Sequence, residues 1–159
     1  MVSLPDKVLK MIRSEQVVIV GSVNKGVCNV SPRTAFHLDQ DGSIYWLELF
    51  KHKTLRNLQK NPWCTVAAFN KKSLTGYQLK GKVTIISNRK TKNLISAKIT
   101  DRLTRLHKQR ILRELKNKKP TIVKFNAKIV FSLKPNEFAD SPMLIDANVE
   151  SLRASDMQW

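Results

Sequence analysis

The chain has 159 residues, of which 42% are hydrophobic, so it is long enough for one domain with a sizeable core. Its 29 lysine and arginine residues outnumber its 12 acids and give a net charge of +17, which favours anionic partners such as nucleic acid, anionic membrane surfaces or phosphorylated ligands. No apolar run reaches the ~20 residues that cross a bilayer, and residues 1–16 are too mixed in charge for a signal peptide, so we expect a cytoplasmic protein without a membrane partner.

Six stretches have the β-branched, aromatic or alternating pattern of strands. They cover residues 17–23, 27–38, 43–50, 63–69, 77–87 and 121–133. Turn residues N-K-G at 24–26 and D-Q-D-G at 39–42 link the first three stretches as hairpins. Pro32 has no N–H to donate and therefore predicts a sheet edge or a bulge. Gly81 predicts a bulge or a close approach by another backbone or a ligand.

Two stretches have helical spacing, and a third at 51–62 is described below. Residues 5–16 mix apolar and charged positions and predict an amphipathic helix, whereas residues 88–119 carry Lys, Arg or Gln at almost every position between their isoleucines and leucines. The basic helix has three open interpretations: a solvated face over an apolar underside, a contact to nucleic-acid phosphates, or a wall that draws in an anionic substrate. It lacks the interleaved aromatic residues of a single-strand platform and has no helix-turn-helix or zinc-finger signature.

Short strands joined by hairpins are typical of an antiparallel barrel, so we predict a mainly β fold with flanking helices. We expect a single domain over residues 1–134 that includes the basic helical insertion 88–119. Residues 135–159 lose all periodicity and form a C-terminal extension that either follows the surface or frays.

The residue types that most often carry chemistry are scattered. Cys28 and Cys64 lie in predicted strands without disulfide or metal-ligand spacing, so we expect buried, reduced thiols. His37, His52 and His107 have no ligand spacing either, and we expect no metal site. No Ser-His-Asp, Cys-His or paired-carboxylate arrangement stands out, so no catalytic residue is assigned.

The stretch KHKTLRNLQKNP at 51–62 follows an apolar strand and predicts a short helix that ends before Pro62. Thr54 is in a position to cap its first turn. The free N–H groups and the positive dipole end of such a helix, beside Lys51 and Lys53, suit a phosphate. The alternative is that the threonine only caps the helix and the lysines are only solvated.

Four blocks together resemble a known family. They are S-P-R at 31–33, D-x-D-G at 39–42, K-x-K-T-x-x-N-L-x-x-N-P at 51–62 and G-Y-Q-L-K-G at 76–81. Over roughly its first three-fifths the chain is similar to the pyridoxamine 5′-phosphate oxidase-like, FMN-binding split-barrel proteins. The resemblance implies a six-stranded antiparallel split barrel that forms a homodimer and binds one FMN in each of two clefts at the subunit interface.

The resemblance also assigns residues to the cofactor. Basic and hydroxyl side chains would hold the flavin phosphate, the strand segment 45–48 would run beside the isoalloxazine ring, and a glutamine of the fifth strand would lie near the flavin. The cofactor-binding residues implied are Arg33, Thr34, Trp46, Leu47, Glu48, Lys53, Thr54 and Gln78.

The implied function is an FMN-binding flavoprotein and flavin-dependent oxidoreductase with a small anionic or redox-active substrate; deazaflavin and haem are the alternative cofactors. The chain ends in ASDMQW, without the arginine and histidine with which the oxidase proper grips pyridoxal phosphate, so oxidation of pyridoxamine phosphate is not expected. A second function class stays open: a polyanion or nucleic-acid-binding module that has kept the barrel and lost the cofactor.

Overall fold

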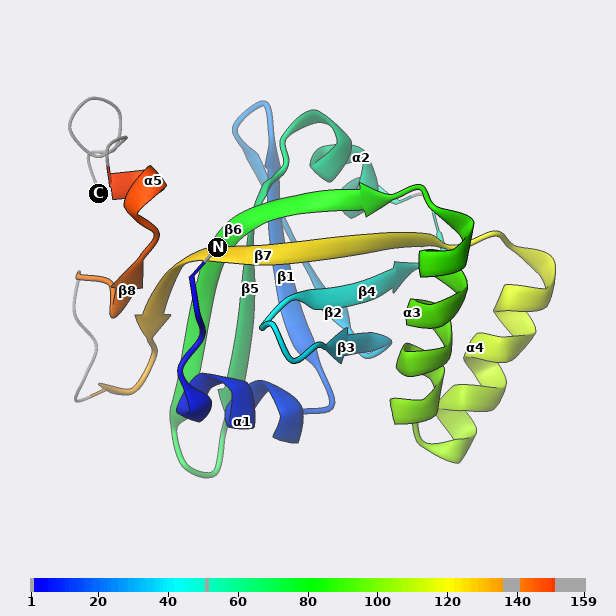
Figure 1. Ribbon diagram of the computed structural model, residues 1–159, viewed down its shortest axis with the longest axis horizontal. Coiled ribbons are helices and arrows are strands. Elements are labelled where there is room, and N and C mark those ends of the chain that lie inside the picture. The colour runs from blue at the N-terminus through cyan, green and yellow to red at the C-terminus, as the bar shows by residue number, and fades with distance from the viewer. Residues whose placement is uncertain (1, 51, 136–140, 151–159) are drawn as a thin grey trace.

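The computed structural model describes residues 2–50, 52–135 and 141–150, and it has one antiparallel sheet with flanking helices (Figure 1). The strands are β1 Val18–Asn24, β2 Val27–Arg33, β3 Phe36–Leu38, β4 Ile44–Glu48, β5 Trp63–Asn70, β6 Thr75–Ile86, β7 Thr121–Ser132 and β8 Leu144–Ile145. The helices are α1 Asp6–Ser14, α2 Lys53–Lys60, α3 Arg89–Arg102, α4 Arg105–Asn117 and α5 Ala147–Glu150. The predicted mainly β fold with flanking helices is confirmed.

The sheet curls because of how β2 and β3 are joined. The strand order is β2-β1-β5-β6-β7-β4-β3, with β8 paired to β7 off this path, so β2 and β3 lie at opposite ends of the order. Only Thr34 and Ala35 separate them, and three peptide steps reach at most about 11 Å, so these two ends of the sheet meet at this corner. The single strand predicted over 27–38 is therefore wrong, and the sheet has eight strands within the described residues, where six were predicted. Pro32 lies on the terminal strand β2, as predicted.

The β1–β2 turn and the bulge in β6 both follow their predictions. Lys25 and Gly26 have φ values of 51° and 75°, the positive values that a two-residue hairpin turn needs. At Gly81 the pairing of β6 with β7 shifts register. A Cβ at this position would collide with the carbonyl oxygen of Asn126 and lie 2.9 Å from the ring of Phe125, so β7 can approach this closely only at a glycine.

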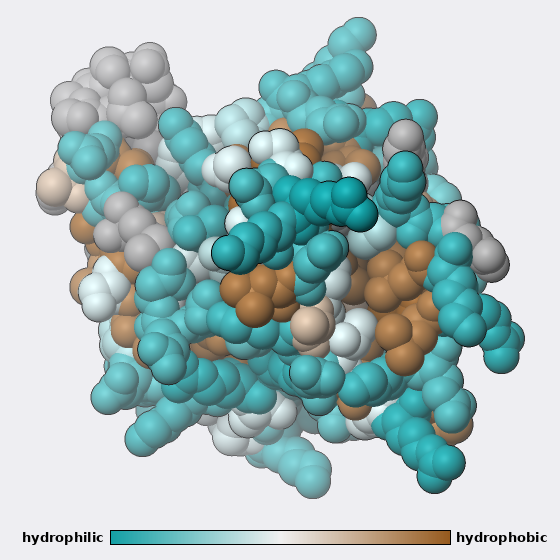
Figure 2. Space-filling model, turned by 45° about the vertical axis from the view of Figure 1, so that its right-hand side comes forward, coloured by the Kyte–Doolittle hydropathy of each residue, from teal (hydrophilic) through white to brown (hydrophobic). Residues whose placement is uncertain are grey.

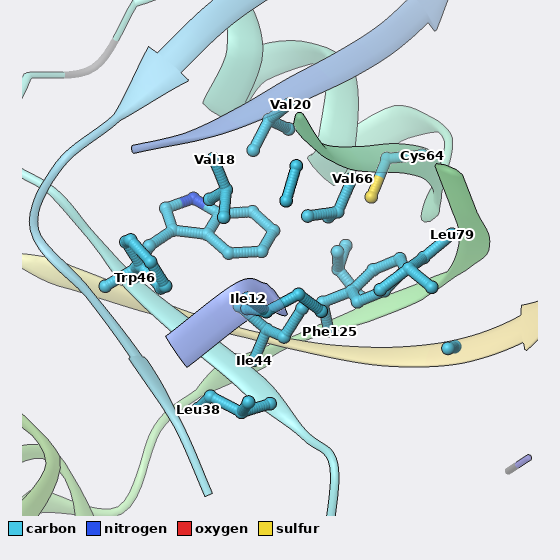
Figure 3. Packing of buried hydrophobic residues seen from close by; sticks show 14 of the residues in the cluster. Ile12, Val18, Val20, Leu38, Ile44, Trp46, Cys64, Val66, Leu79 and Phe125 are labelled. Carbon is cyan, nitrogen blue, oxygen red and sulfur yellow. The ribbon is translucent and has the colours of Figure 1, made fainter. Parts of the chain in front are cut away.

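The main core fills the inside of the curled sheet. Its largest fully buried side chains are Trp46, Phe36 and Phe125, and Figure 3 shows the Trp46 indole within a cluster of aliphatic side chains. Helix α1 adds Val8 and Ile12 to the same cluster, so this helix is held by apolar burial against the sheet.

The remaining long helices cover different parts of the sheet. Helix α2 packs on β1 and β2, and α3 packs on β3 and β4 through Ile95 and Ile99. The basic stretch predicted as one helix is two, because Leu103 leaves the helical conformation and packs toward the cluster formed by these isoleucines. Helix α4 then runs back beside α3 at one end of the molecule (Figure 1). Among the described residues no helix is both long and apolar enough to span a membrane.

Part of the C-terminal stretch docks on the sheet. Strand β8 pairs with β7, and the Nζ atom of Lys128 lies 2.8 Å from Oδ2 of Asp146, the residue that follows β8. Residues 136–140 and 151–159, which include the ASDMQW end, lie outside the described part of the chain. The division into a domain over 1–134 and an extension over 135–159 stays a prediction.

Candidate functional site

A cavity of about 430 Å³ opens between β2, the end of β4 and the start of α2. This volume is within the range of small-molecule and cofactor sites, about 300–1,000 Å³. The sequence-predicted cofactor residues that line it are Arg33, Thr34, Leu47, Glu48, Lys53 and Thr54. Two strands and a helix thus bring six of the eight predicted residues to one place.

Thr54 lies in the cavity, but it is not the helix cap that the sequence predicts. The N-cap of α2 is His52, and Thr54 is a buried residue of the first helical turn. Its hydroxyl accepts a hydrogen bond from Nδ2 of Asn29 at 3.0 Å and shares one with Oγ of Ser31 at 2.8 Å. The prediction of a cap is wrong because partners on β2, more than 20 residues away, engage this hydroxyl and tie α2 to the sheet.

The N-terminal end of α2 is the electropositive part of the cavity. The N–H of Arg56 donates to the carbonyl of His52 at 3.2 Å, so the N–H groups of residues 53–55 have no partner within the helix. Lys53 is exposed at this end, and the first turn carries no acidic residue. Amides, dipole and ammonium together suit a phosphate. Lys51, which the sequence places beside them, lies outside the described residues.

Arg33 and Glu48 form an ion pair in the cavity wall. Nε and Nη2 of Arg33 donate to Oε1 of Glu48 at 3.1 and 2.6 Å, and the two side chains are only 14% and 5% exposed. The same oxygen accepts a hydrogen bond from Nε1 of Trp46 at 2.9 Å. The guanidinium that the family resemblance assigns to the phosphate is thus engaged by a carboxylate, which leaves Lys53 and the helix end as the net positive part of the site.

The other walls of the cavity are apolar. Ala35, Leu47 and Leu49 come from β4 and its neighbouring segments, and Ile111 reaches in from α4. A ring system can lie against these side chains while a phosphate lies at the end of α2. The residues present therefore fit a molecule that carries a phosphate at one end and a flat ring at the other, as FMN does.

A second cavity of about 450 Å³ adjoins the first, and the two share residues 48–50 and His52. Phe50 stacks on His52 with 5.3 Å between ring centroids, and Nζ of Lys118 lies 3.8 Å from the Phe50 centroid. This stack connects the end of α4 to the loop that leads into α2. No local pattern in the sequence predicts it, because Lys118 stands in a run of similar lysines.

Trp46 and Gln78 lie away from the cavity. The Trp46 side chain is fully buried in the core, and its indole N–H donates a hydrogen bond to Glu48 in the cavity wall. Gln78 lies on the outer face of the sheet, where it lines a third cavity of about 520 Å³ together with Cys64. Burial raises the pKa of the Cys64 thiol to about 12, so this thiol stays protonated and is no nucleophile.

The outer face of β1 and β2 is apolar and exposed. Val30 is 69% exposed and Ile19 is 38% exposed, and both line the same cavity as Gln78. Cys28, predicted to be buried, is exposed here because it lies on the terminal strand β2. Contiguous apolar side chains on a strand surface are typical of an interaction face.

The histidines do not converge on one point. His52 lies at the cavity, His37 is partly buried on β3, and His107 is exposed on α4. Within the described residues, no three His, Cys, Asp or Glu side chains are grouped so that they could hold a metal ion.

The sequence model of pyridoxamine 5′-phosphate oxidase matches residues 4–137. The chain has no match among curated protein sequences. Among solved structures, it is similar to HupZ of Group A Streptococcus at 18% identity and a TM-score of 0.66, over 86% of this chain and 98% of that one. A Clostridium acetobutylicum protein described as related to general stress protein 26, of the pyridoxinephosphate oxidase family, has 15% identity and a TM-score of 0.66, over 89% and 93%. HutZ of Vibrio cholerae, described as a heme storage protein, has 14% identity and a TM-score of 0.66, over 82% and 94%.

Proposed function

The chain belongs to the pyridoxamine 5′-phosphate oxidase family, and we propose that it is an FMN-binding flavoprotein that acts as an oxidoreductase on a small anionic or redox-active substrate. The observation that carries this proposal is the cavity in which the electropositive end of α2 stands opposite apolar walls. A phosphate and a ring need these two surroundings within one site.

Each side of the cavity has a separate task in this proposal. Lys53 and the free amides of α2 hold the phosphate, and Thr54 keeps that helix end fixed to β2. Leu47 and Ile111 exclude water from the ring, which supports redox chemistry because the flavin itself carries the electrons. The Arg33–Glu48 ion pair joins the end of β2 to the end of β4 and so keeps this wall of the cavity rigid.

We also propose that the protein is a homodimer with the cofactor near the subunit interface. The exposed apolar face around Ile19 and Val30 supports this arrangement, and Asn29 lines both this face and the cofactor cavity. Replacing Val30 with Asp places a charge on that face, so it should convert the dimer to a monomer in light scattering after gel filtration. A dimer that survives this change would move the interface elsewhere.

Haem is the second candidate cofactor, because HutZ is described as a heme storage protein and this chain has an imidazole at the cavity. His52 is exposed there, and histidine is a common axial ligand of haem iron. Its stacking on Phe50 fixes the plane of the ring.

The absorption spectrum of the purified protein, before and after addition of FMN, tests the proposal. Oxidised flavin bands that persist through gel filtration support FMN, whereas a Soret band supports haem and overturns the flavin assignment. A spectrum that neither cofactor changes would overturn both.

A charge reversal tests the phosphate position. Lys53→Glu should abolish FMN binding, because it puts a negative charge beside the phosphate at the start of α2. Lys60→Glu is the matched control, since it makes the same change at the other, exposed end of the same helix. Titration calorimetry should show FMN binding only for the control, and equal affinity of the two variants would mean that the phosphate lies elsewhere.

A further inference from the structure

The segment 88–119 holds most of the net charge of the protein. It contains twelve lysine and arginine residues and two acids, a net charge of +10 out of +17 for the whole chain. The described structure explains some of these cations: Arg102 donates to the last carbonyls of α1, and Lys98, Lys108 and Lys118 pair with acids. The other eight form no ion pair with any residue that the structure describes.

Helix α4 presents many of these unpaired cations on its outer side. Ile111 faces the cofactor cavity, whereas the basic residues Arg105, Arg110, Arg113 and Lys116 are exposed. Successive helical residues turn by about 100°, so Leu106, Arg110 and Arg113 fall within about 60° of one another. One helix therefore has an inner side at the cofactor cavity and a basic outer side.

Solvent-exposed leucines lie among these cations. Leu106 is 81% exposed in the first turn of α4, Leu112 is 42% exposed further along α4, and Leu94 is 57% exposed on α3. Figure 2 brings this end of the molecule forward and shows hydrophobic patches between long hydrophilic side chains. We call the outer residues of α4 the basic-leucine face; they are Arg105, Leu106, Arg110, Leu112, Arg113 and Lys116.

We propose that the basic-leucine face docks on an anionic phospholipid surface. Arginine and lysine side chains near such a surface are attracted to its headgroups, and exposed leucines gain by entering the boundary between headgroups and acyl chains. The basic side chains of this face thus have the headgroups as partners, and the leucines have the boundary with the acyl chains. Contact of this kind needs no spanning segment, so it adds a membrane partner to a chain whose apolar runs are too short to cross a bilayer.

Nucleic acid is the less fitting occupant. Its phosphates would attract the same cations, but an exposed leucine gains nothing from a phosphate backbone. Proteins that bind single strands use aromatic side chains for stacking, and residues 88–119 contain no Phe, Tyr or Trp. The leucines therefore separate the two occupants, and an experiment can use them for that purpose.

Sedimentation with lipid vesicles tests the proposal. The full-length protein, with its cofactor bound, should pellet with vesicles of equimolar phosphatidylcholine and phosphatidylglycerol and stay in solution with phosphatidylcholine alone. Arg110→Gln with Arg113→Gln should weaken binding about 30-fold, since each basic residue is worth about 1 kcal/mol at such a surface. Leu106→Gln should weaken it about tenfold, the effect of about 1.5 kcal/mol for leucine burial.

Matched controls carry the same substitutions elsewhere. Lys7→Gln with Lys10→Gln removes two exposed charges from α1, and Leu74→Gln changes a leucine that is 54% exposed at the β5–β6 turn. Both controls should bind vesicles like the wild type, and circular dichroism should show that all variants fold. The proposal is wrong if the controls lose as much affinity as the α4 variants, or if no anionic vesicle binds. Full competition by duplex DNA, together with no effect of Leu106→Gln on vesicle binding, would also refute the proposal and indicate nucleic acid as the partner. A change of oligomeric state in Leu106→Gln would refute it too and indicate a contact between two copies of the chain.

Discussion

The ion pair between Arg33 and Glu48 gives the sharpest prediction about the cavity wall. Replacing Arg33 with Met keeps the packing of the aliphatic stem but removes the positive charge. Among the described residues, Glu48, whose side chain is 5% exposed, then keeps the indole N–H of Trp46 as the one hydrogen-bond partner of its Oε1. We expect a large loss of stability, because a nearly buried carboxylate is left without its cation.

The size of the loss follows from burial. Breaking a buried pair by removing one partner costs about 3–5 kcal/mol, and the 14% exposure of the Arg33 side chain favours the low end. A loss of about 3 kcal/mol lowers the melting temperature of a chain of this length by about 6–12 °C. Urea unfolding followed by tryptophan fluorescence measures the free energy directly.

A second substitution separates charge from packing. Arg33→Met with Glu48→Gln removes the stranded charge and keeps an oxygen for the Trp46 indole, so the double variant should be more stable than Arg33→Met alone. If Arg33→Met costs less than about 1 kcal/mol, the value of a surface pair, the carboxylate is well solvated and the reasoning is refuted. Equal stability of the single and double variants would refute it as well.

Two further predictions concern the sheet. Gly81→Ala should destabilise the protein by about 3 kcal/mol in urea unfolding, because a Cβ there collides with the Asn126 carbonyl. Gly21→Ala is the control and should cost little, because its Cβ would meet Thr65 at 3.6 Å. Similar costs for the two variants would contradict the close approach at the bulge. Burial lowers the pKa of His37 from 6.5 despite the nearby Asp39, so the unfolded chain binds more protons once the pH falls below about 6.5 and the free energy of unfolding decreases there. Urea midpoints at about pH 7.5 and 5.5 should therefore differ more in the wild type than in His37→Gln, and an equal difference would show that His37 titrates alike in both states.

Much of the fold could be predicted because its local signals agree with its long-range pairing. The β-branched run at 17–23 and the alternating run at 121–133 do form strands, β1 and β7, although β1 buries only one face and leaves Ile19 exposed on the other. The break between β2 and β3 could not be predicted, because no glycine marks it. Thr34 and Ala35 leave the strand pattern only because the chain must pass from one end of the sheet order to the other.

The site was predictable in outline and not in detail. Basic and hydroxyl residues at the start of a helix indicate an anion site, and Lys53 and Thr54 do lie at one cavity. The role of Thr54 depends on Asn29 and Ser31, which lie on another strand, so local capping rules predict the wrong partner. Trp46 follows the same principle: its placement in the core depends on how β4 packs between β3 and β7, which no pattern within β4 shows.

The point of attachment of α3 and α4 has an evolutionary consequence. Ile86 near the end of β6 pairs directly with Ile122 near the start of β7, so both helices are inserted between two positions that the sheet already holds together. Lengthening or shortening an insertion at such a place changes the loop-closure entropy only slightly and leaves the strand register intact. Relatives can therefore vary this helical pair without disturbing the pairing of β6 with β7, and because Ile111 of α4 lines the cavity, each such change also alters one wall of the candidate site.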